Sequence, residues 1–343
     1  MDNYNNPKIT VLLPVYNCEL YIKEAVESVL NQTFTNFEFL IIDDSSTDNT
    51  VAIIKTYNDS RIQLIEKPVN TGYTNSLNLG LELAKGEYIA RMDGDDISLP
   101  DRFFKQVTFL DSNQDVVLCG TNFSIIDTNK IIRLPENNEE IKIALLKANS
   151  LAHPSVMIRN NKLQEFNLLY DLNKEPAEDY DLWVRLLGIG KIHNLQEILL
   201  NYRVHDTQVS QKREAQQMKS ALESRLKMLE YLNYPFNENE FSLLKKIMLF
   251  NTDLNFNEIK GFSILKQKMI FANSDNFFDS KMFNQYLSDL QKQNLQNYFI
   301  NRDNYYPLIY FRYLQIRDKN IFKLKLKNEF KLLLKSLIYF KRK

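Results

Sequence analysis

Acidic side chains cluster where a cation or a reacting hydroxyl could be held. The segment Asp93-Gly94-Asp95-Asp96 places three carboxylates within four residues. Its glycine lets two of the acids turn toward one point. Several acids held together are costly unless a cation or hydrogen-bond donors neutralise them. A hard divalent cation with oxygen ligands would meet that need, so the pattern favours a metal site over the alternative of a plain acidic loop.

Two other segments carry polar side chains directly after apolar runs, namely Tyr16-Asn17 and Asp43-Asp44-Ser45-Ser46. The preceding runs have the character of strands buried on both faces. Ligands of open parallel sheets bind beyond the carboxyl ends of the strands, so we expect both segments to share one edge with residues 93–96. The alternative for residues 43–46 is an ordinary polar turn that leads into a helix. No Walker lysine motif or GxGxxG follows a predicted strand, which weakens P-loop and dinucleotide interpretations.

The elements that would position these groups alternate between strand and helix patterns. We expect strands at 9–15, 37–42, 62–65, 88–92, 116–119, 155–158 and 198–202, and helices at 21–30, from Asp48, and at 74–84, 100–110, 180–187 and 215–232. This alternation predicts an α/β fold with a mainly parallel sheet and helices on both faces. The pattern becomes helical almost throughout from Gln211. We therefore expect a first domain at 1–210 and a mostly α-helical region at 211–343.

The composition limits the classes of protein that fit. The 343 residues carry 43 basic and 43 acidic side chains, with 44% apolar and 25% charged residues, as in soluble globular proteins. A net charge of zero argues against nucleic-acid binding. Two cysteines, Cys18 and Cys119, cannot form a disulfide framework or a four-cysteine zinc site. The polar start and the lack of about 18 consecutive apolar residues predict no signal peptide and no spanning helix, so we expect a cytoplasmic protein.

Several segments, in order along the chain, resemble the family 2 glycosyltransferases of the GT-A fold. They are KITVLLPVYNCELYIKEAVESVLNQTF, FEFLIIDDSSTDNT, NTGYTNSLNLGLELAKGEYIARMDGDDISLPDRFFKQ, EDYDLWVRL and YRVHDTQVS. The resemblance spans about residues 7–211 and implies a Rossmann-like, nucleotide-sugar-binding catalytic domain there. One departure is Leu77, where many relatives have an arginine, so one cationic contact is missing beside Asn78.

The resemblance implies a role for each matching residue on the donor side. Tyr16 would contact the nucleotide base, and Asp44 would accept the ring N–H of uracil. Asp93 and Asp95 match the DxD motif, with Asp95 and His205 as ligands of Mn²⁺ or Mg²⁺. Asp93 would hold the ribose or the water shell of the metal. The residues matched to the nucleotide and its diphosphate are Pro14, Tyr16, Asp44, Asn70, Asp93, Arg203 and Ser210.

On the acceptor side, the resemblance implies that Asp179 is the general base. It would take a proton from the acceptor hydroxyl as that oxygen attacks the anomeric carbon. The alternative is an N-cap for the helix that follows, because an acid suits that position. Glu178, His153 and Trp183 are the candidates for contact with the acceptor. The alternative for Trp183 is packing beneath the site, since large aromatic residues usually serve burial.

We therefore expect an inverting, metal-dependent glycosyltransferase that uses a nucleotide sugar, most simply a UDP-sugar. Its acceptor would be a saccharide or lipid-linked saccharide in the synthesis of a surface polysaccharide such as capsule or lipopolysaccharide. One alternative is a metal-dependent nucleotidyltransferase, which would need a Gly-rich loop near the N-terminus that the chain lacks. A second is a non-catalytic sugar-binding relative, although Asp93, Asp95 and Asp179 are all present.

The last segment, 317–343, is basic and apolar at once. It holds ten Lys or Arg residues and only two acids, Asp318 and Glu329. A helix of this composition can lie in the headgroup plane of an anionic membrane, which here would be the inner face. The alternative is a terminal helix packed on the preceding helices, with its lysines in water.

Overall fold

The computed structural model describes residues 7–205, 213–250, 254–318 and 321–341. Their contacts divide the chain into two compact units, Met1–Arg225 and Leu226–Lys343, here called the first and the second unit. The boundary predicted near residue 211 falls before this division. Helix α9 (Glu214–Met228) crosses the division and contributes to both units.

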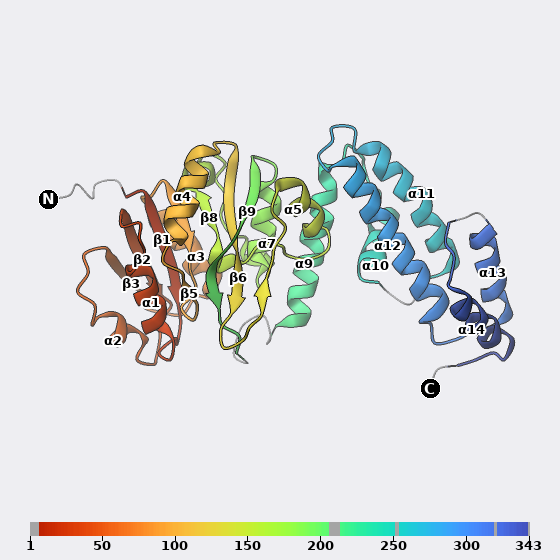
Figure 1. Cartoon of the computed structure of the whole chain (residues 1–343), viewed down its shortest axis with the longest axis horizontal. Helices are drawn as coiled ribbons and strands as arrows, with labels where there is room; N and C mark the ends of the chain where they lie inside the picture. The colour runs from red at the N-terminus through yellow and green to blue at the C-terminus, as the bar shows by residue number, and fades with distance from the viewer. Residues whose placement is uncertain (1–6, 206–212, 251–253, 319–320, 342–343) are drawn as a thin grey trace. The chain divides into compact units, whose positions relative to one another are not determined.

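The first unit is built on a mixed sheet with the strand order β3-β2-β1-β4-β8-β6-β9-β5, and β7 pairs with β6 (Figure 1). The strands are β1 (Ile9–Val15), β2 (Phe37–Asp43), β3 (Ile62–Glu66), β4 (Tyr88–Arg91), β5 (Ile97–Ser98), β6 (Val116–Ile125), β7 (Ile131–Ile132), β8 (Met157–Arg159) and β9 (Lys191–Tyr202). The helices before α9 are α1 (Ile22–Leu30), α2 (Thr50–Ile54), α3 (Tyr73–Leu83), α4 (Arg102–Ser112), α5 (Asn138–Leu145), α6 (Asn160–Glu165) and α7 (Glu178–Leu186).

One half of the sheet is parallel, as the sequence predicts, and the other half is mixed. Strands β3, β2, β1 and β4 run parallel, and every residue of β1 and β2 is buried, as their continuous apolar character requires. Strand β8 then pairs antiparallel with both β4 and β6. Beyond β4 the sheet is therefore mixed, since β8 is antiparallel to both of its neighbours while the long pair of β6 with β9 is again parallel. Strands β5 and β7, of two residues each, had no sequence signal.

Two buried polar side chains of α4 donate hydrogen bonds to backbone carbonyls in the mixed half of the sheet. Arg102 donates hydrogen bonds to the carbonyls of Arg91 (2.8 Å) and Val156 (3.2 Å). Gln106 donates to the carbonyls of Cys119 (2.7 Å) and Ser155 (2.9 Å). These two side chains therefore fasten α4 to the backbone of β4, of β6 and of the residues just before β8.

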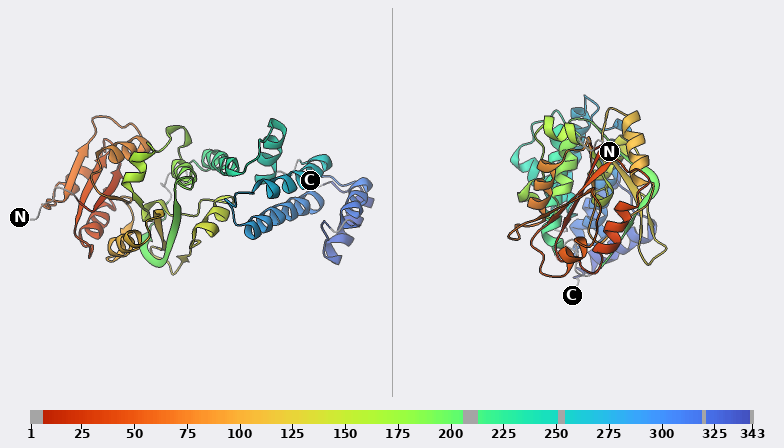
Figure 2. Two further views of the ribbon diagram at one scale, coloured as in Figure 1. Left: turned by 90° about the horizontal axis from the view of Figure 1, so that it is seen from above. Right: turned by 90° about the vertical axis from the view of Figure 1, so that its left-hand side faces the viewer.

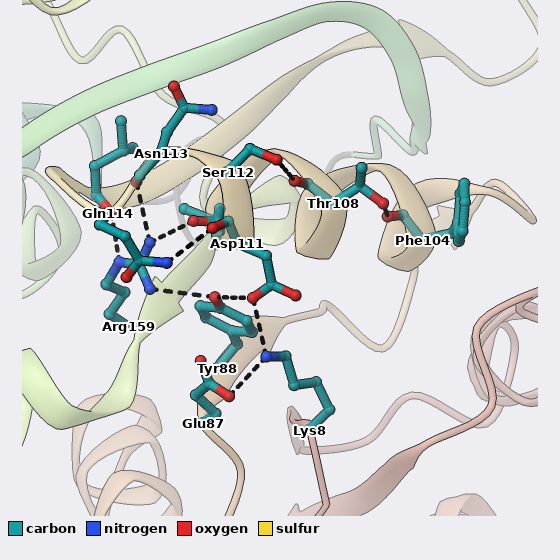
Figure 3. A network of polar contacts seen from close by, with 12 residues as sticks. Lys8, Glu87, Tyr88, Phe104, Thr108, Asp111, Ser112, Asn113, Gln114 and Arg159 are labelled. Carbon is teal, nitrogen blue, oxygen red and sulfur yellow. Dashed lines mark hydrogen bonds and ion pairs between the residues drawn. The ribbon is translucent and has the colours of Figure 1, made fainter.

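A second network ties β4 and β8 to the far end of α4 (Figure 3). Arg159 donates to the hydroxyl of Tyr88 (3.1 Å) and to the carbonyl of Val116 (2.7 Å). The Tyr88 hydroxyl donates to Asp111 (2.6 Å), which also pairs with Lys8 (2.9 Å). Because Tyr88 and Arg159 face each other across the β4–β8 pair, the network fixes the register of this pair.

The second unit is helical over its described residues. It contains α10 (Glu238–Met248), α11 (Phe256–Ala272), α12 (Ser280–Ile300), α13 (Pro307–Asp318) and α14 (Leu326–Leu337), and α11 packs along α12 (Figure 1). Asn237 and Asn255 begin α10 and α11 with capping boxes completed by Glu240 and Glu258. Figure 2 shows these helices from two further directions. Among the described helices, none is long and apolar enough to cross a membrane.

Gly86 offers a test of the close packing between the turn before β4 and β1. A Cβ at this position would lie 2.2 Å from the backbone nitrogen of Thr10 and 2.6 Å from the carbonyl carbon of Ile9. We expect Gly86→Ala to destabilise the first unit by about 1–3 kcal/mol, because the backbone must shift. The only tryptophan, Trp183, is buried in this unit, so its fluorescence during urea unfolding reports the change.

Gly261→Ala on α11 is the control, since its Cβ would meet only Leu243 at 3.5 Å. Because Gly261 lies in the second unit, both variants are also followed by far-ultraviolet circular dichroism, which reports the helices of both units. The packing argument fails if Gly86→Ala unfolds at the same urea concentration as the unchanged chain.

Candidate functional site

The carboxyl ends of β1 and β2 bring the polar segments to one edge, as expected. Val15 pairs with Asp43, and the Asp44 N–H donates to the Val15 carbonyl (2.9 Å). The two loops beyond are then tied together: the Asn17 N–H donates to the Ser46 hydroxyl (2.9 Å). Asn17 and Ser45 both adopt positive φ, at 52° and 65°. The edge is therefore a connected surface of short loops rather than separate turns.

The loop after β4 gathers three carboxylates. Asp93, Asp95 and Asp96 each offer an oxygen, and these oxygens lie within 4.8 Å of one another. Asp96 is 1% exposed, and one of its carboxylate oxygens has no hydrogen-bond partner among the described residues. Burial, together with the neighbouring carboxylates, raises the pKa of Asp96 well above its usual range and also raises the pKa of Asp93. Three carboxylates this close together favour a cation among them.

Residues at the end of β9 and just beyond it lie against this cluster. The Nε2 atom of His205 is 2.9 Å from Oδ2 of Asp95, and its ring stacks on Tyr21 at 5.4 Å. Arg203 donates its backbone N–H to Asp96 (2.8 Å) and its Nε–H to the Asp95 carbonyl (2.8 Å). The structure therefore brings together the predicted metal ligands Asp95 and His205. The Arg203 guanidinium is also paired with Glu24 at 2.7 Å.

A buried arginine at the end of β4 connects the cluster to the rest of the site. Arg91 is 1% exposed, forms an ion pair with Asp93 and donates a hydrogen bond to the Tyr73 hydroxyl. Its charge opposes the rise in the pKa values of Asp93 and Asp96, and it acts in the same direction on Glu178 and Asp179. One cation therefore lies within electrostatic reach of both groups of acids.

The second group of acids begins helix α7. Burial and the charge of Asp179 raise the pKa of Glu178 to about 8, and burial raises the pKa of Asp179 to about 6. Asp179 accepts hydrogen bonds from the Asn149 amide (2.7 Å) and the Tyr180 N–H (2.6 Å). The N-cap of α7 is Ala177, so the N-cap alternative for Asp179 is wrong. A carboxylate poised near neutral pH suits proton transfer.

Aromatic residues pack against one another between the acids at 93–96 and the acids at 178–179. The His153 ring bonds to the hydroxyls of Tyr73 (3.2 Å) and Tyr170 (2.9 Å), and it packs edge-on against Trp183. Burial and the charge of Arg91 hold the His153 pKa well below its usual range, so this imidazole is neutral. The Trp183 ring is 0% exposed and presents no surface to a sugar, which supports the packing alternative for this residue.

The predicted base-binding residues lie at the ends of the parallel strands. Tyr16 is 48% exposed, whereas Pro14 is buried within β1. Asp44 is 3% exposed and pairs with Lys67 at 2.6 Å. It also accepts the N–H groups of Thr71 (3.0 Å) and Gly72 (2.9 Å) and thereby holds the loop that carries the exposed Asn70.

The sequence did not identify three residues of the site: Arg91, Tyr73 and Lys67. Arg91 stands two residues before Asp93, the first acid of the cluster. This closeness in sequence was the one signal that could have identified Arg91 as a residue of the site. Asn78 has both amide atoms bonded to the backbone of Tyr170 at 2.9 Å, so it braces the chain before α7. Ser210 lies outside the described residues.

Comparison with known proteins shows the family of the chain. The family model described as glycosyl transferase family 2 matches residues 10–172. An Escherichia coli protein, the UDP-Glc:alpha-D-GlcNAc-diphosphoundecaprenol beta-1,3-glucosyltransferase WfaP, is 34% identical over 204 residues, which are 59% of this chain and 79% of that protein. The chain belongs to glycosyl transferase family 2. It is therefore a glycosyltransferase, and this excludes the nucleotidyltransferase alternative.

Solved structures support the fold. The S. aureus TarS 1-349 structure in complex with UDP matches with a TM-score of 0.56 and 18% identity, covering 96% of this chain and 90% of that one. The mannosyltransferase PcManGT from Pyrobaculum calidifontis, in complex with GDP-Man and Mn²⁺, matches with a TM-score of 0.54 and 15% identity, covering 85% and 87%. The mixed sheet and the helical C-terminal region thus follow the GT-A architecture seen in TarS.

The ion pair between Arg91 and Asp93 can be tested by substitution. Arg91→Gln leaves Asp93 without its cation beside two other acids. We expect a loss of stability at the lower end of about 3–5 kcal/mol, because Asp93 is partly exposed. Urea unfolding followed through Trp183 measures this loss.

Lys55→Gln provides the control, because Lys55 and Glu66 form an ion pair exposed to solvent. Loss of this exposed pair should change the free energy of unfolding by less than about 1 kcal/mol. Equal unfolding midpoints for Arg91→Gln and Lys55→Gln would show that Arg91 has no special part in the site.

Proposed function

We propose that the chain is an inverting, metal-dependent glycosyltransferase. It would move a sugar from a nucleotide sugar, most simply a UDP-sugar, to a saccharide or lipid-linked saccharide acceptor in the synthesis of a surface polysaccharide. The observation that carries the proposal is the placement of two groups of acids within electrostatic reach of one buried arginine, Arg91. One group suits a cation and a diphosphate, and the other suits the removal of a proton.

The residues fit a divalent cation at the first group. Three carboxylates converge, and one Asp96 oxygen is buried without a partner among the described residues, so the cluster needs a cation. Asp95 and His205 would be the protein ligands, since an imidazole nitrogen and a carboxylate together suit Mn²⁺, and Mg²⁺ is the alternative. When bound, the cation would neutralise the charge that develops on the departing nucleoside diphosphate.

The donor would lie along the strand ends. Pro14 and Tyr16 would border the base, with Tyr16 free to pack against it because its ring is half exposed. Asp44 would accept the base N–H from its position beside Lys67, and Asn70 lies in the loop that Asp44 holds. Asp93 would face the ribose or the water shell of the cation. The proposed diphosphate contacts are Arg203 and Ser210.

The acceptor would enter beside α7. The acceptor oxygen forms a bond to the anomeric carbon while the bond from that carbon to the diphosphate oxygen breaks. Asp179 takes the proton that the acceptor oxygen loses. Attack from the side opposite the leaving group inverts the anomeric carbon. Glu178 and His153 are the proposed acceptor contacts, and the raised pKa of Glu178 lets this side chain donate a hydrogen bond at neutral pH.

The named relatives support the choice of donor and acceptor. WfaP is named for a UDP-sugar donor and a diphosphoundecaprenol-linked acceptor, TarS was solved with UDP, and PcManGT with GDP-Man and Mn²⁺. We accordingly propose that residues 1–210 bind donor and acceptor in the cytoplasm. A lipid-linked acceptor would be met at the inner face of the membrane.

Removal of one metal ligand tests the donor side. We expect Asp95→Ala to abolish transfer and to reduce binding of UDP in Mn²⁺ to the level that the unchanged chain shows after chelation. Calorimetric titration of UDP with and without Mn²⁺ measures this, and Asp115→Ala at an exposed pair with Lys191 is the control. Full activity of the chelated, unchanged chain would overturn the metal requirement.

Asp179→Asn tests the acceptor side. We expect unchanged binding of UDP but a turnover lower by about 10²–10⁴-fold, because the amide cannot accept the proton. In the unchanged chain the Asp179 pKa of about 6 makes the base ionised above pH 6 and protonated below it. The transfer rate should therefore fall about tenfold per pH unit below 6.

A screen of purified nucleotide sugars and saccharide acceptors supplies the substrates for this rate profile. Proton NMR of the product then gives its anomeric configuration. Retention of the anomeric configuration would rule out a single displacement with Asp179 as the base. The same conclusion would follow if the transfer rate of Asp179→Asn still fell about tenfold per pH unit below pH 6.

A further inference from the structure

Helix α14 exposes a continuous apolar face near the end of the second unit. The large apolar side chains of this face, including two just beyond the helix, are 45–84% exposed: Leu326, Phe330, Leu334, Leu337, Ile338 and Tyr339. Positions 326, 330 and 334 are spaced by four residues, so they form one row along the helix. A contiguous exposed apolar surface usually marks a site of interaction.

The opposite edge of α14 is already packed on its own unit. Leu332 is 0% exposed and Ser336 is 1% exposed. Phe322 and Leu324 before the helix are buried, and the Leu324 N–H donates to the Tyr313 hydroxyl of α13 (3.2 Å). Packing on the preceding helices therefore explains one edge of this helix but leaves the exposed face without a function.

A row of lysines runs beside the apolar row. Lys327, Lys331 and Lys335 are also spaced by four residues, and each follows a residue of the apolar row by one position, or about 100° around the helix. Lys327 and Lys331 are exposed, whereas Lys335 is partly buried against the rings of Tyr305 and Phe340. Between residues 321 and 341 there are six lysines and one acid, Glu329. That acid is engaged by Arg317 (2.7 Å) and the Tyr313 hydroxyl (3.1 Å), so the exposed charge beside the apolar face is positive.

We propose that α14 lies in the headgroup plane of an anionic membrane. Its apolar row would enter the headgroup–acyl boundary by about 5–10 Å, while the exposed Lys327 and Lys331 contact anionic headgroups. Each lysine near such a surface strengthens the attraction to it. A second copy of the chain paired antiparallel through this face would bring two lysine rows together, whereas an anionic membrane complements both the apolar row and the lysines. The proposal concerns the second unit and does not depend on the transfer reaction.

The test uses the full chain and vesicles of phosphatidylcholine with and without phosphatidylglycerol. Phe330→Trp adds one exposed tryptophan to a chain whose own Trp183 is buried. We expect its emission to shift to the blue with anionic vesicles and to be quenched by lipids brominated near the headgroup. We also expect binding to weaken with salt, because the attraction is screened within about 10 Å at 0.1 M.

Two sets of substitutions separate the apolar and the charged contributions in co-sedimentation. Leu326→Ser with Leu334→Ser and Leu337→Ser, and separately Lys327→Glu with Lys331→Glu, should each weaken binding at least tenfold. The matched controls are Ile264→Ser with Phe271→Ser on the exposed face of α11, and Lys85→Glu with Lys130→Glu in the first unit. We expect both controls to bind as the unchanged chain does.

Equal binding by all variants, or no preference for anionic vesicles, would overturn the proposal. So would a dimer in light scattering that the serine substitutions dissociate, since α14 would then be a contact between copies of the chain. Because these measurements use no donor or acceptor, their failure would leave the proposed transfer reaction standing.

Discussion

The ion pair between Arg91 and Asp93 is the interaction on which the site depends. Asp93, Asp95 and Asp96 form one group of acids, and Glu178 and Asp179 form another. Carboxylates held this close together and largely buried are costly without a counterion. Arg91 supplies one positive charge from the end of β4, where it is 1% exposed. Its backbone carbonyl is itself held by Arg102 of α4. The position of the charge is therefore set by the sheet and not by a mobile loop.

One arginine does not balance these acids, and the remaining imbalance is informative. The pKa values of Asp93, Asp96, Glu178 and Asp179 are all raised despite the presence of Arg91. Around Asp93 and Asp96 the deficit is what a divalent cation would relieve. Around Glu178 and Asp179 the deficit of positive charge leaves a carboxylate that can take up or release a proton near neutral pH. In the proposed reaction, the same excess of negative charge that costs stability would bind the cation at one group of acids and accept the proton at the other.

The sequence predicted the first half of the fold well because apolar runs and helical periodicity dominate there. Strands β1 and β2 are buried along their whole length, so their pattern is unambiguous. Strand β8 was harder, because it is three residues long and its antiparallel pairing with β4 depends on Tyr88 and Arg159, far apart in sequence. The DxD residues and the acidic pair were identifiable by resemblance. Arg91 was not, because a buried arginine leaves no periodic signal, and its value appears only when the acids are seen around it.

Burial also decided between alternatives that the sequence left open. Trp183 is 0% exposed, and its ring packs edge-on against His153. Neither fact can be deduced from residue type. For Asp179 the start of α7 at Glu178 removed the capping alternative. In the second unit, the exposed apolar row of α14 could be recognised only after the structure showed which side of the helix packs on its own unit.

Anomalous diffraction from a crystal grown with Mn²⁺ and UDP would test the central claim most directly. We expect one strong manganese peak within bonding distance of an Asp95 oxygen and of His205, with UDP along the strand ends and the Arg91–Asp93 pair intact. A manganese peak away from residues 93–96, or UDP bound outside the edge formed by β1, β2 and β4, would contradict the assignment of this edge as the donor site.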